Sequence, residues 1–265
     1  MSKAHKVTLE LNKDKFPDLL DKLGELQKIG DGEQGGVVKL KINKDETIMY
    51  ALKGDSAILA FKSYTFPTSD YFIFKDDFDF TFDFIIGSTQ KFIKTSKIFN
   101  LSTDEKLKMT LSYRENNNDE TMMQVRAAQI KDSKFKFSVI IAEPYKIRDI
   151  NKKLLMQKLD LDNAAWHFDC SKSDLDDIKK MAAIYDDSIL TINVNEGDVE
   201  ISQAGQWNLN VAKIEEKGDS LSIDKKYLKL ITIKEDIIKF SIFDRFILFK
   251  EDNMNLMIAY ELTFE

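Results

Sequence analysis

Cysteine, proline and glycine are scarce in this chain of 265 residues, which contains one cysteine, three prolines and ten glycines. The single cysteine, Cys170, excludes a disulfide within the chain and favours a reducing compartment. No stretch reaches the roughly 18 consecutive apolar residues that a membrane-spanning helix needs. The chain opens with Met-Ser-Lys-Ala-His-Lys rather than with an apolar signal core, so we expect a cytoplasmic protein.

Motifs for catalysis or cofactor binding are also missing. The sequence has two histidines, His5 and His167, and it contains no Gly-x-Gly-x-x-Gly, no phosphate-binding loop and no Cys/His spacing typical of a metal site. Asp77, Asp79 and Asp83 could suggest a site for a hard metal ion, but they alternate with phenylalanines. A solvated strand face explains this alternation more simply. We therefore predict a protein that is not an enzyme, with no catalytic residue, no metal and no cofactor.

What the chain does contain is an internal repeat, which is the first feature to interpret in any sequence. Residues 6–23, K-V-T-L-E-L-N-K-D-K-F-P-D-L-L-D-K-L, share a pattern with residues 165–182, A-W-H-F-D-C-S-K-S-D-L-D-D-I-K-K-M-A. Both read as an alternating strand, a polar turn and an amphipathic helix. At the offset of 159, the apolar positions Phe16, Leu19, Leu23 and Leu26 fall on Leu175, Ile178, Ala182 and Tyr185. Cys170 falls on Leu11, so we expect a small buried apolar side chain rather than a nucleophile.

A second repeat supports the first. Lys91-Phe92-Ile93-Lys94 recurs as Lys226-Tyr227-Leu228-Lys229 at an offset of 135. Apolar residues make up 43% of the chain, which is enough for a packed core. The two repeats predict an α+β fold built from two copies of one unit.

Periodicity places the elements of each copy in the same order. In the first copy the expected strands are 6–11, 37–43, 47–53, 56–63, 69–75, 78–86, 107–114, 121–130 and 135–142, with helices at 13–28 and 88–98 that Asn12 and Ser88 would cap. In the second copy they are 165–170, 188–194, 198–203, 207–214, 219–223, 237–243, 245–250 and 255–263, with helices at 172–185 and 224–231. Residues 144–164 lack alternation and have no repeat, so we divide the chain into domains at 1–143 and 165–265 joined by this connector.

Charge is distributed unevenly along the chain. The net charge is −6, yet residues 87–98 and 224–231 together carry +5, which leaves −11 for the remainder. Lys91, Lys94 and Lys97 follow the i, i+3, i+6 spacing that places side chains along one helix face, opposite Phe92 and Phe99. The first helix of each copy has equal numbers of lysines and acids, as solvated helices often do. Lysines gathered on repeated helices of an acidic protein suggest sequence-independent contact with a polyanion.

Two long segments carry a resemblance to a known family. F-D-C-S-K-S-D-L-D-D-I-K-K-M-A-A-I-Y-D-D-S-I-L-T-I-N-V-N-E-G-D-V-E-I-S-Q-A-G resembles the opening strand, helix and strand pair of a DNA sliding-clamp domain. I-I-K-F-S-I-F-D-R-F-I-L-F-K-E-D-N-M-N-L-M-I-A-Y-E-L resembles the closing strands of the same domain. The first copy matches the same order less tightly. The two-domain length is similar to proliferating cell nuclear antigen and to the clamps of tailed phages, and the lysine-, isoleucine- and asparagine-rich composition favours a phage.

The resemblance implies a non-catalytic processivity factor: a homotrimeric ring of six domains whose helices line a hole around double-stranded DNA, working with a DNA polymerase and a clamp loader. The residues that would face DNA are Lys13, Lys15, Lys91, Lys94, Lys97, Lys172, Lys179, Lys225, Lys226 and Lys229. The subunits would pair through the strands near 121–130 and 198–204. Partner peptides would dock in an apolar pocket between the domains, at positions matched by Leu52, Tyr145, Ile147, Leu154, Leu155, Ile258, Tyr260 and Leu262.

Other functions fit the same residues. The chain could be a clamp-like subunit of a mixed ring, or a phage protein that binds partners without encircling DNA. It could also be a tandem-domain binding or virion protein unrelated to DNA. The mass of the assembled particle separates these functions, because only the homomeric ring requires a trimer.

Overall fold

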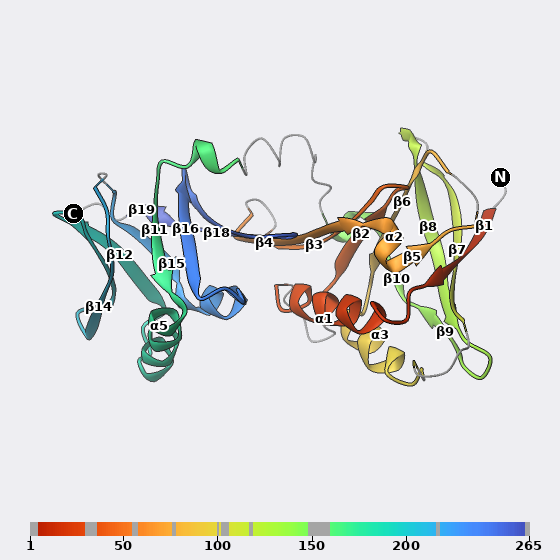
Figure 1. Cartoon of the computed structure of the whole chain (residues 1–265), viewed down its shortest axis with the longest axis horizontal. Coiled ribbons are helices and arrows are strands. Elements are labelled where there is room, and N and C mark those ends of the chain that lie inside the picture. The colour runs from red at the N-terminus through yellow and green to blue at the C-terminus, as the bar shows by residue number, and fades with distance from the viewer. Residues whose placement is uncertain are drawn as a thin grey trace. The chain divides into compact units, whose positions relative to one another are not determined.

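A computed structural model of the chain describes residues 5–29, 36–54, 58–75, 78–99, 101, 106–116, 119–147, 160–215 and 218–262. The chain forms two compact units (Figure 1). The first unit contains residues 1–53 and 62–148, and the second unit contains residues 54–61 and 149–265. Each unit has mainly antiparallel strands and few helices, which confirms the predicted α+β class.

The first unit begins with a strand and a helix, as predicted, and continues mainly with strands. Its elements are β1 (His5–Leu11), α1 (Phe16–Leu26), β2 (Val38–Ile42), β3 (Glu46–Lys53), β4 (Ala60–Pro67), α2 (Thr68–Tyr71), β5 (Phe72–Ile73), β6 (Thr81–Ile86), α3 (Thr89–Ser96), β7 (Leu107–Asn116), β8 (Asp119–Lys131), β9 (Lys136–Val139), β10 (Ile141–Ala142) and the 3-10 helix η1 (Pro144–Lys146). The first two residues of β4 are grouped with the second unit.

The second unit follows the same order. Its elements are η2 (Leu161–Asn163), β11 (Trp166–Ser171), α5 (Lys172–Ile184), β12 (Ile189–Asn195), β13 (Asp198–Gln203), β14 (Trp207–Lys213), β15 (Leu221–Asp224), η3 (Lys225–Leu230), β16 (Ile237–Phe243), β17 (Phe246–Glu251), β18 (Met254–Ala259) and β19 (Glu261–Leu262). The predicted connector falls largely on residues 148–159, which lie outside the described residues.

Strand pairing repeats from one unit to the other. In both units the first strand pairs with the strand that follows the repeated helix α3 or η3, as β1·β7 and β11·β16. The next hairpins also correspond, as β7·β8 with β16·β17 and β8·β9 with β17·β18. So do β2·β3 with β12·β13, β2·β6 with β12·β15, and β6·β10 with β15·β19. The predicted tandem repeat is therefore confirmed at the level of the hydrogen-bonded sheet.

The helices form where the apolar spacing predicts them. Helix α1 buries Phe16, Leu19 and Leu23, and α5 buries Leu175, Ile178 and Ala182 at the repeat positions. An apolar stripe of this kind holds a surface helix on a sheet because its burial removes apolar area from water. The repeat partner of Leu26 is Tyr185, which lies at the C-cap of α5 rather than within it.

The helix caps differ from the prediction for the first unit. The N-cap of α1 is Lys15, not Asn12, and Lys15 makes no side-chain hydrogen bond there. The Asn12 carboxamide instead accepts a hydrogen bond from the main-chain N–H of Asp14 at 3.1 Å, which closes a turn ahead of the helix. In the second unit the Ser171 hydroxyl caps α5 by accepting from the main-chain N–H of Asp174 at 3.0 Å.

Three predicted strands of the first unit are wrong in extent or type. The strand expected at 56–63 is β4, which begins later, and it buries Lys62 and Ser63 in succession, so both of its faces are covered. The segment 69–75 is not one strand, because it forms α2 and the two-residue strand β5. The strand expected at 78–86 is shortened to β6. In the second unit the helix expected at 224–231 is the 3-10 helix η3.

Candidate nucleic-acid and partner surfaces

Helix α3 presents three lysines on its solvent side. Lys91, Lys94 and Lys97 are exposed, whereas Phe92 and Phe99 are each only 6% exposed. Within the described residues, no carboxylate pairs with these three ammonium groups. The predicted basic face of α3 is therefore confirmed as an exposed, unneutralised row of cations. Ser88 occupies the N-cap position, as predicted, but its side chain makes no capping hydrogen bond.

Helix α1 lies beside α3 in the first unit (Figure 1). The Cδ1 atom of Ile93 on α3 lies 3.9 Å from the position that a Cβ atom would occupy on Gly24 of α1. Two acids of α1 are bound within the unit. Asp18 accepts hydrogen bonds from the Lys22 ammonium at 2.5 Å and from the Tyr71 hydroxyl. Burial opposes ionisation of Asp18, but these two hydrogen bonds outweigh it and hold the pKa of the Asp18 carboxyl below its usual range.

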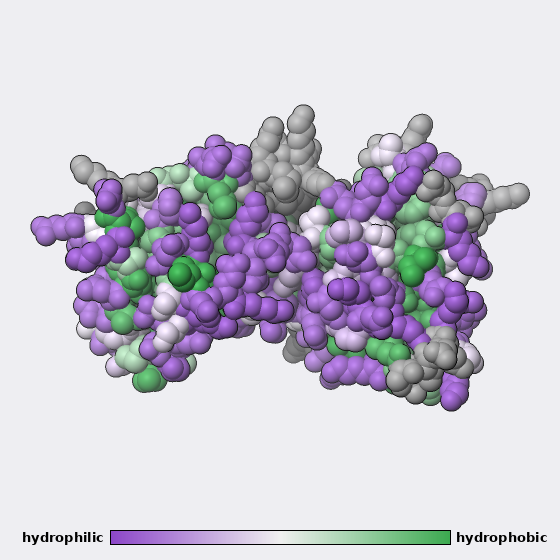
Figure 2. Space-filling model, in the orientation of Figure 1, coloured by the Kyte–Doolittle hydropathy of each residue, from purple (hydrophilic) through white to green (hydrophobic). Residues whose placement is uncertain are grey.

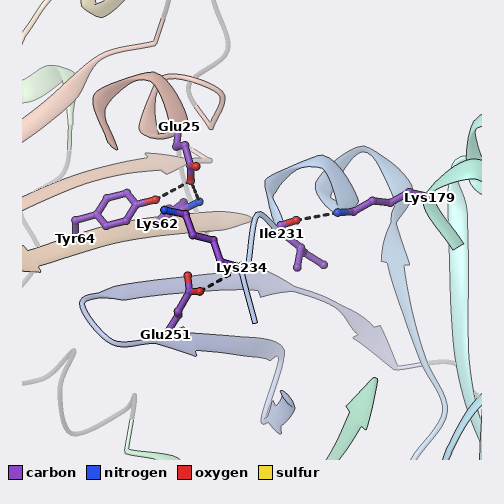
Figure 3. A network of polar contacts seen from close by, with 7 residues as sticks. All are labelled: Glu25, Lys62, Tyr64, Lys179, Ile231, Lys234 and Glu251. Atoms are coloured by element: carbon purple, nitrogen blue, oxygen red, sulfur yellow. Dashed lines mark hydrogen bonds and ion pairs between the residues drawn. The ribbon is translucent and has the colours of Figure 1, made fainter. Parts of the chain in front are cut away.

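Glu25 makes the second internal acid contact of α1 (Figure 3). Its Oε2 atom accepts hydrogen bonds from the Lys62 ammonium at 2.5 Å and from the Tyr64 hydroxyl at 2.7 Å. The Lys62 side chain is 1% exposed and that of Glu25 is 27% exposed. The pair of Asp18 with Lys22 cancels within the count of four lysines and four acids in 13–28, whereas Glu25 pairs with Lys62 outside it. The balance of unpaired charge that α1 offers to a ligand is therefore more positive than the count indicates.

The 3-10 helix η3 repeats the pattern of α3. Lys226 and Lys229 are exposed, and Tyr227 between them is 6% exposed, like Phe92 at the repeat position. Lys226 is not as open as its counterpart Lys91, since its ammonium forms an ion pair with Asp224 and lies 5.0 Å from the ring centre of Tyr227. The cationic face of the second unit is therefore weaker than that of α3.

The other predicted lysines of the second unit contact their own main chain. Lys225 donates to the carbonyl oxygens of Ala182, at 3.1 Å, and of Tyr185, which lie at the C-terminal end of α5, where orphan carbonyls favour a cation. Lys179 donates to the carbonyl oxygen of Ile231 at 2.9 Å (Figure 3), and burial lowers the pKa of its ammonium. These contacts secure η3 and its flanking residues to α5.

The remaining predicted DNA-facing lysines differ in exposure. Lys172 is exposed and lies 3.5 Å from the carbonyl oxygen of Lys234. Lys15 is exposed and Lys13 is half-buried. The structure thus divides the ten predicted lysines into an exposed group of seven and a half-buried group of Lys13, Lys179 and Lys225.

The predicted partner-binding residues are only partly described. Leu52 is half-buried and Ile147 is 2% exposed, both in the first unit. Ile258 is fully buried in the second unit, and the half-buried Tyr260 donates to the carbonyl oxygen of Phe243 at 2.7 Å. Burial raises the pKa of the Tyr260 hydroxyl. Leu154 and Leu155, and the side chains of Tyr145 and Leu262, lie outside the described residues.

The predicted edges for subunit pairing are wrong. The strand β13, which covers the segment near 198–204, lies between β12 and β14. The strand β8, which covers 121–130, pairs with β7 on one side and with β6 and β9 on the other. Interior strands have no free main-chain groups to offer a second copy. The sheet instead ends at β14 in the second unit, and β9 pairs on one side, with β8.

No family model matches the chain, and no curated protein matches it. Among solved structures, the DNA polymerase sliding clamp from Bacillus subtilis matches with a TM-score of 0.65 at 10% identity, over 98% of this chain and 66% of that one. A putative DNA polymerase III β subunit from Eubacterium rectale matches with a TM-score of 0.63 at 14% identity, over 98% and 66%. The chain has the sliding-clamp fold. The Helicobacter pylori β clamp, solved with a DNA ligase peptide, matches with a TM-score of 0.59 at 13% identity, over 98% and 67%.

The sliding-clamp fold confirms the resemblance seen in the sequence. The chain spans about two thirds of the length of the clamps it matches, in keeping with two repeated units. In the part of the chain that the structure describes, no group of three or more histidine, cysteine, aspartate or glutamate side chains is placed to hold a metal ion. None of the described helices is long and apolar enough to cross a membrane. On the face drawn in Figure 2, hydrophilic residues predominate and apolar ones gather in small patches.

Sequence reasoning missed two parts of this surface. The carboxylates of Asp18 and Glu25 were counted with the solvated face of α1, although the (i, i+4) spacing of Asp18 and Lys22 signals a pair. The partner of Glu25 is Lys62, which lies on β4 and has no local sequence signal. The sequence places Phe74, Phe78 and Phe80 on strands, and the structure gathers these half-buried side chains into one cluster.

Proposed function

We propose that this protein is a sliding clamp that encircles duplex DNA and tethers a DNA polymerase to its template. The observation that carries the proposal is the exposed lysine row on α3, repeated in part on η3, within a chain that has the sliding-clamp fold. The fold by itself does not specify a ligand, because proteins of low sequence identity share it. The exposed lysines are the feature that indicates a polyanionic ligand.

The lysines would act on DNA as mobile point charges. Ammonium groups contact phosphates without reading base edges, so the attraction is independent of sequence and is weakened by salt. The rest of the chain carries a net −11, which discourages contact between DNA and other surfaces. Enclosure then keeps the protein on DNA while each contact stays weak, and a bound polymerase gains a high effective concentration at its template.

We infer that three copies close the ring, because the resemblance implies a ring of six units and each chain has two. Three chains of two units supply six units. Among the strands with an open side are β14, at the end of its sheet, and β9, which is paired on one side. On β14 the half-buried Leu209 and Val211 alternate with the exposed Asn208 and Asn210, as in a strand with one covered face. We infer that β14 of one copy pairs with β9 of the next, which would remove both edges from solvent.

The partners in this proposal are a DNA polymerase, a clamp loader and other client proteins. The Helicobacter pylori clamp solved with a DNA ligase peptide supports peptide docking on this fold. Of the predicted apolar residues that the structure describes, the half-buried Leu52 and Tyr260 are the proposed docking residues. The two-unit length and the composition support an origin in a tailed phage, and hence action in the host cytoplasm.

The first experiment measures assembly. Sedimentation equilibrium over a range of concentrations is expected to show a species of three times 30.6 kDa. The trimer is then formed from dilute subunits in the presence of nicked circular plasmid and passed through a gel-filtration column. Retention on the circle and release after linearisation would show enclosure. A monomer at every concentration would reject the homotrimer and favour a mixed ring or a protein that does not encircle DNA.

The second experiment tests the lysines. The variant in which Lys91, Lys94, Lys226 and Lys229 are replaced by alanine is expected to remain a trimer but to bind duplex DNA with a smaller salt dependence. The slope of log K against log salt concentration is negative, and each lost phosphate contact reduces its magnitude by about 0.9. A matched variant removes the same charge from other exposed lysines: Lys131, Lys134, Lys239 and Lys250. Equal slopes for the two variants would reject the assignment of α3 and η3 to the DNA-facing wall.

A further inference from the structure

One segment of the first unit has no counterpart in the second. The repeated strands β4 and β6 are joined by residues 68–80, whereas β14 and β15 are joined by residues 214–220. The longer segment contains Tyr71, Phe72, Phe74, Phe78 and Phe80, and the shorter one contains no aromatic residue. Because the second unit completes the same strand pairings without such an insertion, the aromatic side chains are not required by the fold.

The insertion gathers its rings into a half-exposed cluster. The ring centres of Phe74 and Phe78 are 4.4 Å apart, those of Phe78 and Phe82 are 5.3 Å apart, and those of Phe80 and Tyr113 are 5.7 Å apart. Phe82 is buried at the base of the cluster, while Phe74, Phe78 and Phe80 remain half-buried. Large aromatic side chains left partly in water on one of two repeated units are typical of a binding surface.

A cleft of about 590 Å³ opens beside the cluster, within the size range of ligand and peptide side-chain sites. Its apolar wall includes Phe72, Phe74, Phe78 and Ile73, and Ile73 is 47% exposed. The polar lining consists of Thr68, Ser69, Lys44 and Lys75. Among the described residues, the charged side chains that line the cleft are therefore both lysines.

The strand at the cleft is also an edge. β5 pairs with β1 through Ile73 and Phe72 and ends the order of its sheet. An extended chain can add to such an edge through its main-chain groups while alternate side chains enter neighbouring pockets. The free edge, the apolar wall and Lys75 lie on one short segment, and Lys44 lines the same cleft from the turn between β2 and β3.

We propose that this cleft docks an extended segment of a partner protein that alternates apolar and acidic residues. One apolar side chain of the partner enters between Ile73, Phe74 and Phe78, and its carboxylates lie against Lys44 and Lys75. Asp70 and Asp79 are exposed beside the cleft but do not line it. Because they would repel acids spread along the whole partner segment, they favour a partner whose acids lie only over the two lysines. The site is additional to the docking residues proposed above and does not depend on ring formation.

The test uses a fluorescein-labelled peptide of eight residues in which leucine alternates with aspartate, titrated with the full-length protein. Saturable binding is expected, weakened at least tenfold by Ile73→Asp and by Lys75→Glu. Ile237→Asp on β16 is the matched control, because Ile237 is 60% exposed on the second unit and should leave binding unchanged. Hydrogen exchange is expected to slow at residues 72–75 when the peptide binds.

Three results would overturn the proposal. The first is an absence of binding at millimolar peptide. The second is equal binding by a peptide with lysine in place of aspartate, or equal losses for Ile73→Asp and Ile237→Asp. The third is a change in sedimentation of the peptide-free protein caused by Ile73→Asp, which would show that a second copy of the chain covers the cleft.

Discussion

Replacing Glu25 by glutamine tests the contact that fastens α1 to β4. The Lys62 side chain is 1% exposed, and its ammonium lies 2.5 Å from the Glu25 carboxylate. Glutamine keeps the length of the side chain and an oxygen that can accept from Lys62 and Tyr64, so the geometry is preserved while the negative charge is lost. The variant therefore removes the Glu25 charge from beside a buried cation.

The expected loss of stability follows from the burial of the two groups. Removing one partner of a buried ion pair destabilises a protein by about 3–5 kcal/mol, since the remaining charge is desolvated without compensation. The Glu25 side chain is 27% exposed, which lets some water reach the site and favours the lower end, about 3 kcal/mol. With an m value of about 2 kcal/mol/M, this loss lowers the urea midpoint of the first unit by about 1.5 M.

The two units can be followed separately in the same sample. Both tryptophans of the chain, Trp166 and Trp207, belong to the second unit, so their fluorescence reports that unit alone. Circular dichroism reports both units. Glu25→Gln should shift a transition seen by circular dichroism and leave the tryptophan transition in place. Asp177→Asn is the control, because it breaks the exposed pair of Asp177 with Lys180 in α5 and should shift neither transition.

A double-mutant cycle gives the result that would refute this reasoning. The variant that combines Glu25→Gln with Lys62→Met removes both charges and should recover most of the stability that Glu25→Gln loses. Additive losses in the double variant would show that the two charges do not interact. A loss below about 1 kcal/mol for Glu25→Gln alone would show that water solvates the Lys62 ammonium, in conflict with its burial.

Two further predictions concern single ionisable groups. Because the pKa of Asp18 is depressed in the folded state, its contribution to stability is present above the unfolded pKa of about 3.9 and is lost as the pH falls through the folded pKa. Asp18→Asn should therefore reduce the fall of the urea midpoint between pH 6 and pH 3, and an unchanged pH profile would contradict the assignment. Burial, followed by the charge of Asp174, raises the pKa of the Cys170 thiol to about 12. This thiol should react with a disulfide reagent at pH 8 only as fast as the second unit unfolds, and prompt reaction of the folded protein would refute its burial.

The sequence predicted most of the fold because the repeated units rely on simple periodicity. β1 and β11 alternate buried and exposed residues, and the stripes of α1 and α5 are spaced as amphipathic helices require. Prediction failed where both faces of an element are covered. In β4 the succession Ala60 to Tyr64 is buried without a break, so no period of two marks its start.

The edges of the sheets could not be predicted from the strands themselves. β13 alternates like an edge strand with one covered face, yet it has neighbours on both sides, because β14 follows it in the chain and folds back against it. Whether a strand lies at the edge or in the interior of a sheet depends on the elements beside it. The alternation of buried and exposed residues within the strand does not identify those elements.

The sequence predicted the part of the candidate site that depends only on charge and helical spacing. Lys91, Lys94 and Lys97 needed only helical spacing to be placed on the exposed face of α3. Lys225 and Lys179 were grouped with them by sequence, but their ammonium groups donate to carbonyl oxygens around α5. Such contacts join residues distant in the chain, so counting charges within one helix does not reveal them.

The repeated pairing of the two units has a consequence for engineering this chain. The two units share one order of paired strands but differ in their side chains. A residue type found in both units indicates what the fold requires, whereas one found in a single unit is specific to that unit. The residue at the repeat position of Glu25 is Ile184, which is 69% exposed, so the Lys62–Glu25 ion pair is specific to the first unit. Both members of such a pair can be replaced together without disturbing the shared strand pairing, whereas Leu19 and Ile178, which are buried at the same repeat position, mark a position that is apolar in both units.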